Sequence, residues 1–226
     1  MKKEAAAGIV FAALAAYFFT RGNEARAAQV DVETQDTSAA PSDADRNADT
    51  TQPNYAPPTA SNDADRNVSA FLFTIRASEH RYPDNVLNDA AYHIFYGGKR
   101  FYDMSDHPAI TGEVAPVPLS DTVCAASGLE PGCVSTAAGA YQFIRPTWKR
   151  LKNKLNLQDF SPGSQDLAAV QLLDDIGALS MVQSGDIQGA LKKASKVWAS
   201  LPGSSAQQNP KTLQYALDRF AEGLTA

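Results

Sequence analysis

The sequence predicts an α+β fold that is mostly helical with a small antiparallel sheet. Residues 67–79 carry apolar side chains at helical spacing, and residues 91–102 contain two short apolar segments around a Gly-Gly turn. From residue 146 onward, four successive segments again show helical periodicity. One helix, a small sheet and then several helices form an α+β order. We therefore expect one globular domain over residues 67–226.

The first predicted helix brings a carboxylate into register with a buried stripe. One face of this helix carries four apolar residues at the spacing i, i+3, i+4 and i+7, namely Val68, Phe71, Leu72 and Ile75. The same stripe reaches Glu79 one turn later, where a chain turn follows, so we expect Glu79 at the edge of the core. Partial burial raises the pKa of a carboxyl group because the charged form loses more hydration. Glu79 could then act as a general acid near neutral pH, unless it simply points to solvent from the last turn.

The remaining elements are expected in a simple order along the chain. Residues 91–95 and 100–102 are predicted to form a β-hairpin around Gly97-Gly98. Residues 110–135 are rich in Pro, Gly and Ser and are predicted to form a loop, and residues 141–144 are expected to be a third short strand. The helices expected after this point cover residues 146–155, 164–180, 186–195 and 209–220.

The N-terminal part of the chain is expected to precede the domain as two further segments. Residues 1–28 contain a basic start and an apolar run at 5–20, which predicts a membrane anchor or a signal peptide. The positive-inside rule then directs the rest of the chain out of the cytoplasm. Residues 29–66 have almost no large apolar side chain and are predicted to be a disordered linker. We expect a catalytic domain in the periplasm, exported across the inner membrane or anchored in it, or carried by a virion.

The charge of the chain argues against nucleic acid as a partner. The net charge is −5, with 6 basic and 10 acidic residues in positions 1–67 and 14 basic and 15 acidic residues in the remainder. The globular part is therefore close to neutral, whereas a nucleic-acid-binding domain is usually basic.

A series of short motifs runs along residues 71–220, in the order Ser78-Glu79, Tyr92, Gly97-Gly98, Phe101, Ser105-Asp106-His107-Pro108, Ala138-Gly139, Tyr141-Gln142, Asp159-Phe160-Ser161-Pro162, Ser164-Gln165-Asp166, Gly177-Ala178-Leu179, Gly185-Asp186-Ile187 and Trp198-Ala199-Ser200-Leu201-Pro202-Gly203. Through these motifs residues 71–220 closely resemble the bacteriophage lambda endolysin family, which are lysozyme-like lytic transglycosylases. Two features depart from the family, namely His80 where glycine is expected and the long loop at 110–135.

The resemblance implies an activity and a set of site residues. It implies a lysozyme-like fold and cleavage of the peptidoglycan bond between N-acetylmuramic acid and N-acetylglucosamine, with Glu79 first as acid and then as base toward the muramic C6 hydroxyl. Tyr141 and Gln142 would line the glycan cleft, the tyrosine as an aromatic face for a sugar ring and the glutamine as an amide for its acetamido group, unless Tyr141 packs in the core and Gln142 faces the solvent. Asp106 and His107 would contact substrate unless they only stabilise a turn. The resemblance implies no cofactor and no metal, and we expect a monomer.

A hydrolytic muramidase is the first alternative, because it would cut the same bond with water. Hydrolysis requires a second carboxylate about 5–5.5 Å from the acid for retention or about 6.5–9.5 Å for inversion. Asp103 and Asp106 at the end of the predicted hairpin are the candidates.

Three other classes compete with a glycosidic enzyme. A zinc amidase would need histidines at metal-ligand spacing, and the three histidines are scattered. A cysteine peptidase would use Cys124 or Cys133 as nucleophile, but two cysteines in a loop of an exported chain favour a disulfide. The third class is a membrane-tethered wall-binding or virion structural module that retains the fold without activity.

Overall fold

The computed structural model describes residues 60–80, 89–204 and 210–225. It consists of short strands and helices arranged around one long helix, α1 (Ala60–Glu79). The predicted anchor at 5–20 and most of the predicted linker lie outside the described residues. Within the described ranges, none of the helices combines the length and the apolar character that a membrane crossing needs.

The elements follow the predicted α+β order. After α1 come η2 (Ala90–His93), β1 (Ile94–Phe95), η3 (Tyr96–Gly98), β2 (Lys99–Arg100), α3 (Pro108–Thr111), β3 (Val117–Pro118), α4 (Asp121–Ala126) and β4 (Val134–Ser135). The helical part contains α5 (Arg145–Leu155), α6 (Pro162–Asp175), α7 (Leu179–Gln183), α8 (Ile187–Ala194) and α9 (Leu213–Gly223). The mostly helical fold with small antiparallel sheets is thus confirmed.

Helix α1 begins at Ala60, before the predicted domain boundary at residue 67. Its early turns have helical partners, since Arg66 lies 3.8 Å from Asp63 one turn earlier and donates to the carbonyl of Leu224. The expectation of a disordered linker up to residue 66 is therefore wrong for the described residues before 67. The polar composition of this segment does not reveal its contact with the C-terminal end of the chain, such as the bond from Arg66 to Leu224.

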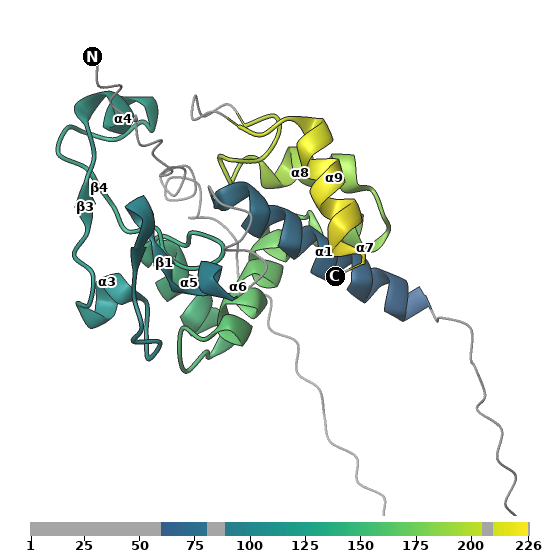
Figure 1. The fold of residues 1–226 in the computed structure, drawn as a ribbon, viewed down its shortest axis with the longest axis horizontal. Helices are drawn as coiled ribbons and strands as arrows, with labels where there is room; N and C mark the ends of the chain where they lie inside the picture. Colours follow the sequence, from purple (N-terminus) through teal and green to yellow (C-terminus); the bar gives the residue numbers. More distant parts are fainter. Residues whose placement is uncertain (1–59, 81–88, 205–209, 226) are drawn as a thin grey trace, which may run out of the picture.

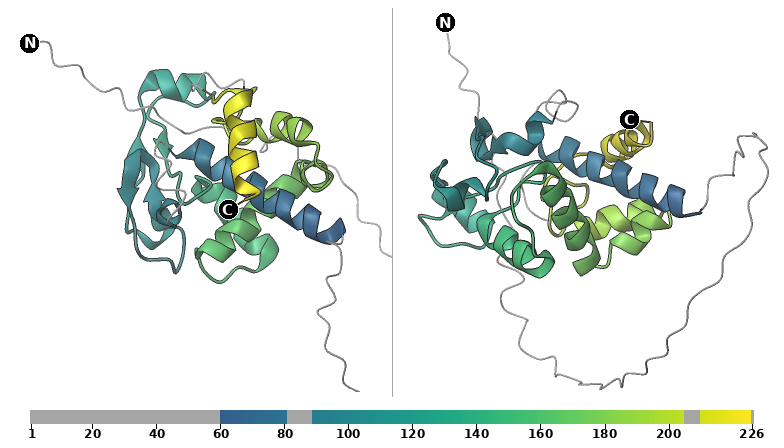
Figure 2. Two further views of the ribbon diagram at one scale, coloured as in Figure 1. Left: turned by 45° about the vertical axis from the view of Figure 1, so that its right-hand side comes forward. Right: turned by 90° about the horizontal axis from the view of Figure 1, so that it is seen from below.

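The central position of α1 follows from its apolar stripe. Phe71 and Ile75 are completely buried, and α6, α7 and α9 pack against the helix. Figures 1 and 2 show α9 crossing α1, while the β-hairpins lie toward the C-terminal end of α1. The end of α1, where Glu79 lies, is therefore the part of the helix closest to the sheet side of the molecule.

The first hairpin is confirmed, although its strands are shorter than predicted. Strands β1 and β2 pair antiparallel, with Ile94 opposite Arg100, across the 3-10 turn η3. Gly97 and Gly98 in this turn have φ angles of +79° and +84°, which strongly favour glycine. The Gly-Gly pair therefore identified the position of the hairpin correctly.

Two predicted boundaries are wrong for conformational reasons. Residues 141–144 are not a strand, because the chain reverses at Gly139 and Gln142, both with positive φ, so that Ala138 pairs with Phe143 in an isolated bridge. The helix predicted over 164–180 is two helices, since Gly177 has a φ of +66° and separates α6 from α7.

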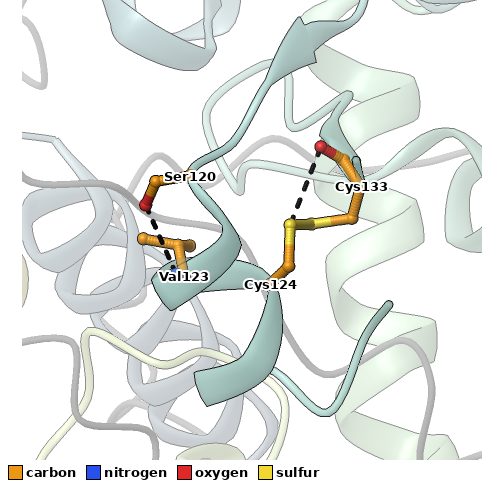
Figure 3. The surroundings of a disulfide bond; sticks show 4 residues. All are labelled: Ser120, Val123, Cys124 and Cys133. Carbon is orange, nitrogen blue, oxygen red and sulfur yellow. Dashed lines mark hydrogen bonds between the residues drawn. A yellow bond between two sulfur atoms is a disulfide. The ribbon is translucent and has the colours of Figure 1, made fainter. Parts of the chain in front are cut away.

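The segment predicted as a loop at 110–135 contains regular structure and the disulfide. Strands β3 and β4 pair antiparallel, and α4 lies between them with Ser120 capping its first turn through the amide of Val123. Cys124 on α4 is bonded to Cys133, and their Cα atoms are 5.8 Å apart (Figure 3). The predicted disulfide is present, and both cysteines of the chain are used, so neither is available as a peptidase nucleophile.

The disulfide makes a testable contribution to stability. Replacing both Cys124 and Cys133 by serine should lower the free energy of unfolding by about 3 kcal/mol, because the unfolded chain regains the entropy of a loop of about ten residues. Urea denaturation of the oxidised protein and the double variant measures the difference. Under reducing conditions the difference should shrink, and equal stability without reductant would contradict this role.

Candidate active site

Glu79 is the last residue of α1 and is almost fully buried, with 7% of its surface exposed. The last helical bond among the described residues here is the one from the amide of His80 to the carbonyl of Arg76, at 3.2 Å. The C-terminal end of a helix carries partial negative charge, which disfavours a carboxylate. Both its burial and its position on α1 therefore favour the neutral form of Glu79.

The carboxyl group of Glu79 is held by Ser200. The Ser200 hydroxyl donates to Oε1 of Glu79, and the backbone N–H of Ser200 also bonds to this carboxyl. Ser200 itself is completely buried in the turn that follows α8. This turn is fixed to the rest of the molecule, because the indole N–H of Trp198 donates to the carbonyl of Tyr141 at 3.1 Å.

Burial raises the pKa of Glu79 to about 7. The two hydrogen bonds from Ser200 act in the opposite direction, as does the positive charge of Lys211, and they are outweighed by the loss of hydration. A carboxyl group with a pKa near 7 can donate a proton and later accept one at neutral pH. The expectation that Glu79 lies at the edge of the core with a raised pKa agrees with this geometry.

The side chain of the buried Gln165, which was assigned no role from the sequence, fixes the short loop that contains Gly139 and Ala140. Gln165 on α6 accepts from the amide of Ala140 at 2.9 Å and donates to the carbonyls of Tyr92 and Phe160. A Cβ atom at Gly139 would lie only 2.1 Å from the Gln165 amide oxygen, so this close approach requires glycine. The loop therefore reaches the residue after Glu79, where His80 Nε2 lies 3.1 Å from the Ala140 carbonyl.

Tyr141 does not present a ring to the solvent as predicted. It is 1% exposed, and its hydroxyl donates to Asp166 at 2.5 Å and accepts from Arg76 at 2.9 Å. Tyr92 donates to the same oxygen of Asp166. The structure thus places the buried Tyr141 in a partly exposed polar network that joins α1 to α6, and it supports core packing over an aromatic face for a sugar.

Gln142 is also occupied by the chain itself. Its backbone has a φ of +49°, and its amide nitrogen donates to the carbonyls of Ile94 and Gly139 at 3.1 and 2.9 Å. These two bonds use both amide hydrogens, so Gln142 stabilises the turn next to the hairpin. The predicted amide donor for an acetamido group is therefore absent at this position.

Asp106 bonds to two side chains of α5, and His107 caps α3. Asp106 accepts from the indole of Trp148 at 2.7 Å and from Lys152 at 2.8 Å, and these bonds hold its pKa below the usual value in spite of partial burial. His107 is completely buried and caps α3 by accepting from Ala109, while its Nε2 donates to a backbone carbonyl. Burial lowers the pKa of His107 to about 4, so it is neutral. The structure supports the turn-stabilising alternative for both residues.

The described residues offer Glu79 no carboxylate partner. Asp103 is exposed and accepts from the amide of Ser105, and Asp106 has the partners given above. Among the described residues, the charged side chain that acts on the Glu79 carboxyl is Lys211. The same part of the chain contains no group of three His, Cys, Asp or Glu residues arranged for a metal ion.

Ser200 and Lys211 are the site residues that sequence reasoning missed. Ser200 lies in the stretch 198–203 that supported the family resemblance, but a serine among apolar residues does not by itself reveal its partner. Lys211 lies in a polar segment just before α9, and nothing in the sequence around it indicates a role in the site. Only the packing of α9 and of the turn after α8 against α1 brings both residues to Glu79.

A buried glutamate with a pKa near 7, at the end of a long core helix beside small hairpins, defines a lysozyme-like protein. The structure is similar to that of bacteriophage lambda lysozyme complexed with a chitohexasaccharide, with a TM-score of 0.56 and 32% identity over 70% of this chain and 94% of that one. A second structure of lysozyme from bacteriophage lambda matches with a TM-score of 0.52 and 30% identity, over 70% of this chain and 92% of that one.

The sequence comparisons give the same result at the level of the family. The chain belongs to the Endolysin family, whose model matches residues 69–224. It is 36% identical to the endolysin of Escherichia phage lambda over 58% of this chain and 73% of that protein. It is 33% identical to the endolysin of Escherichia phage P2 over 66% of this chain and 87% of that protein.

Burial of Glu79 should make stability depend on pH. The unfolded chain loses this proton near pH 4.5 and the folded protein near pH 7, so the favourable contribution of neutral Glu79 is complete below 4.5 and is lost as the pH rises through 7. Replacing Glu79 by glutamine should therefore raise the free energy of unfolding at pH 8 by about 3 kcal/mol.

Urea denaturation at several pH values measures this gain, which should disappear below about pH 4.5. The exposed residue Glu130, changed to glutamine, is the control and should show no such pH-dependent gain. A variant Glu79→Gln that is no more stable than the original protein at pH 8 would contradict the burial of a proton-binding carboxyl.

Proposed function

We propose that the protein degrades peptidoglycan as a lytic transglycosylase during host cell lysis. The observation that carries this proposal is the buried Glu79, with a pKa of about 7 and no described carboxylate acting on it. Membership of the Endolysin family supports the substrate, and the similar lambda lysozyme structure is a complex with a β-linked amino-sugar oligomer. A transglycosylase needs one acid that changes into a base, which is the chemistry of a single group of this kind.

Glu79 performs two proton transfers in this mechanism. Because Oε1 accepts from Ser200, the proton of the neutral acid belongs on Oε2. That proton passes to the glycosidic oxygen as its bond to C1 of the muramic residue breaks, and Glu79 becomes a carboxylate. The carboxylate then takes the proton of the muramic C6 hydroxyl while O6 bonds to C1, which gives a 1,6-anhydro product and restores the acid.

Hydrolysis of the same bond is the second candidate reaction. It requires a carboxylate that activates water on the other face of the sugar ring. The two candidates at the hairpin are engaged elsewhere, Asp106 by Trp148 and Lys152 and Asp103 by a backbone amide. This arrangement favours the reaction that needs no second carboxylate.

Mass spectrometry of the products tests the proposal. The full chain acting on purified peptidoglycan should release muropeptides lighter by one water than hydrolytic products, and release should fall as the pH rises through about 7. Glu79→Gln should release none.

Three outcomes would contradict the proposal in different ways. Products with reducing ends would indicate a muramidase, and Asp103 and Asp106 would then have to be tested. Unchanged activity of Glu79→Gln would remove the assigned acid. Intact peptidoglycan with the original protein would favour a wall-binding or virion structural module.

We also propose that the domain acts outside the cytoplasm, exported or anchored through residues 5–20. The basic start and apolar run support this location, and so does a disulfide, which persists in oxidising compartments. Changing Leu14 to glutamate should then release the protein from the membrane fraction, because a charge in the apolar run is costly to bury in lipid. The matched change Leu14→Val should leave fractionation as it is, and an unaltered membrane fraction in the glutamate variant would contradict the proposal.

A further inference from the structure

Lys211 lies against the two segments that hold Glu79 in place. Its backbone N–H donates to the carbonyl of Ser200 at 2.8 Å, and Ser200 is the residue whose hydroxyl and amide bond to Glu79. The lysine is half-buried and directly precedes Thr212, which caps α9 through the amide of Tyr215. The position of Lys211 is thus fixed by backbone bonds on both sides.

The ammonium group of Lys211 is held in place by Tyr215. The Lys211 nitrogen lies 5.1 Å from the centre of the Tyr215 ring, which is a cation–π distance. The Tyr215 hydroxyl donates at 2.9 Å to the carbonyl of Ala77, two residues before Glu79. Tyr215 therefore connects the charge of Lys211 to the last turn of α1.

Lys211, just before α9, and Arg219, on α9, differ in their ion-pair partners. Arg219 lies on the same aromatic ring, 5.6 Å from its centre, but forms an ion pair with Glu222 at 2.6 Å. Within the part of the chain that the structure describes, Lys211 has no ion-pair partner closer than 4 Å, and its positive charge acts on Glu79. Lys211 and Arg219 thus lie over the same Tyr215 ring, and of the two only the charge of Lys211 acts on Glu79.

We propose that Lys211 is a positioning residue that stabilises the carboxylate form of Glu79 between the two proton transfers. This inference rests on the proposed function. When Glu79 has given its proton to the leaving oxygen, a negative charge remains in a buried site, where the described hydrogen bonds to it come from Ser200. The ammonium of Lys211, held on the Tyr215 ring, lowers the cost of that charge and so favours the departure of the proton.

The other titratable groups that the structure describes around Glu79 do not supply this charge. His80 is neutral because burial lowers its pKa to about 4, and Arg76 bonds to Tyr141 and lies near Asp166. The remaining described titratable groups are Tyr92 and those on α1, on α9 and in the turn after α8, namely Asp63, Asp65, Arg66, Lys196, Tyr215, Asp218, Arg219 and Glu222. None of them is a cause of the raised pKa of Glu79.

The test is the titration of Glu79 in the full chain with Lys211 changed to methionine. Carbon-13 NMR of the labelled carboxyl group follows the titration without any need for activity. The midpoint should move upward by about half a pH unit, because the acid loses a neighbouring positive charge. The high-pH limb of kcat/KM for muropeptide release should move upward with it.

Three further variants separate this role from a structural one. Lys211→Arg keeps the charge and should retain the original midpoint, and Arg219→Gln removes the other cation on the Tyr215 ring and should also leave it unchanged. Tyr215→Leu frees the ammonium and should move the midpoint in the same direction as Lys211→Met.

An unchanged midpoint in Lys211→Met would overturn the proposal, and so would an equal change in Arg219→Gln. If the midpoint moves while the original protein releases no muropeptide, the electrostatic role stands and the proposed function fails.

Discussion

The hydrogen bond between Ser200 and Glu79 joins two positions that are 121 residues apart and brings the helical half of the chain onto the end of α1. It depends on a buried site, because an exposed serine and glutamate would each prefer water. The turn that carries Ser200 is fixed in turn by Trp198, whose indole bonds to the backbone of the loop beside His80. The acid is therefore held by three segments that only the complete fold brings together.

The burial of Glu79 also explains why the polar residues near the sheet have structural roles. A loop that turns sharply beside a buried acid must satisfy its own backbone groups without water. Gln165, Gln142 and His107 each bond to backbone groups of this region, so their side chains are committed to holding the loop and its neighbours. Glu79 itself has a pKa of about 7, so its protonation can change at neutral pH.

The periodic parts of the sequence predicted the fold well because their signals are local. The apolar stripe of residues 67–79 located the long helix and its terminal acid, and Gly97-Gly98 located the hairpin. The orientation of Tyr141 could not be predicted in this way, because its partners Arg76 and Asp166 come from helices 65 residues before it and 25 residues after it. The roles of Ser200 and Lys211 also depend on residues far away in the sequence, since Ser200 and Glu79 are 121 residues apart.

The proposed reaction requires the carboxyl group of Glu79 both to hold a proton and to release it, and burial and the neighbouring Lys211 together make both possible. Burial alone would keep the proton on Glu79 so firmly that its release would cost a desolvated charge. The bonds from Ser200 and the charge of Lys211 act in the opposite direction and leave the pKa near 7, where both forms are accessible. Since Ser200 and Lys211 lie outside α1, substitutions at these positions can adjust the pKa of Glu79 without changing the sequence of the helix that carries it.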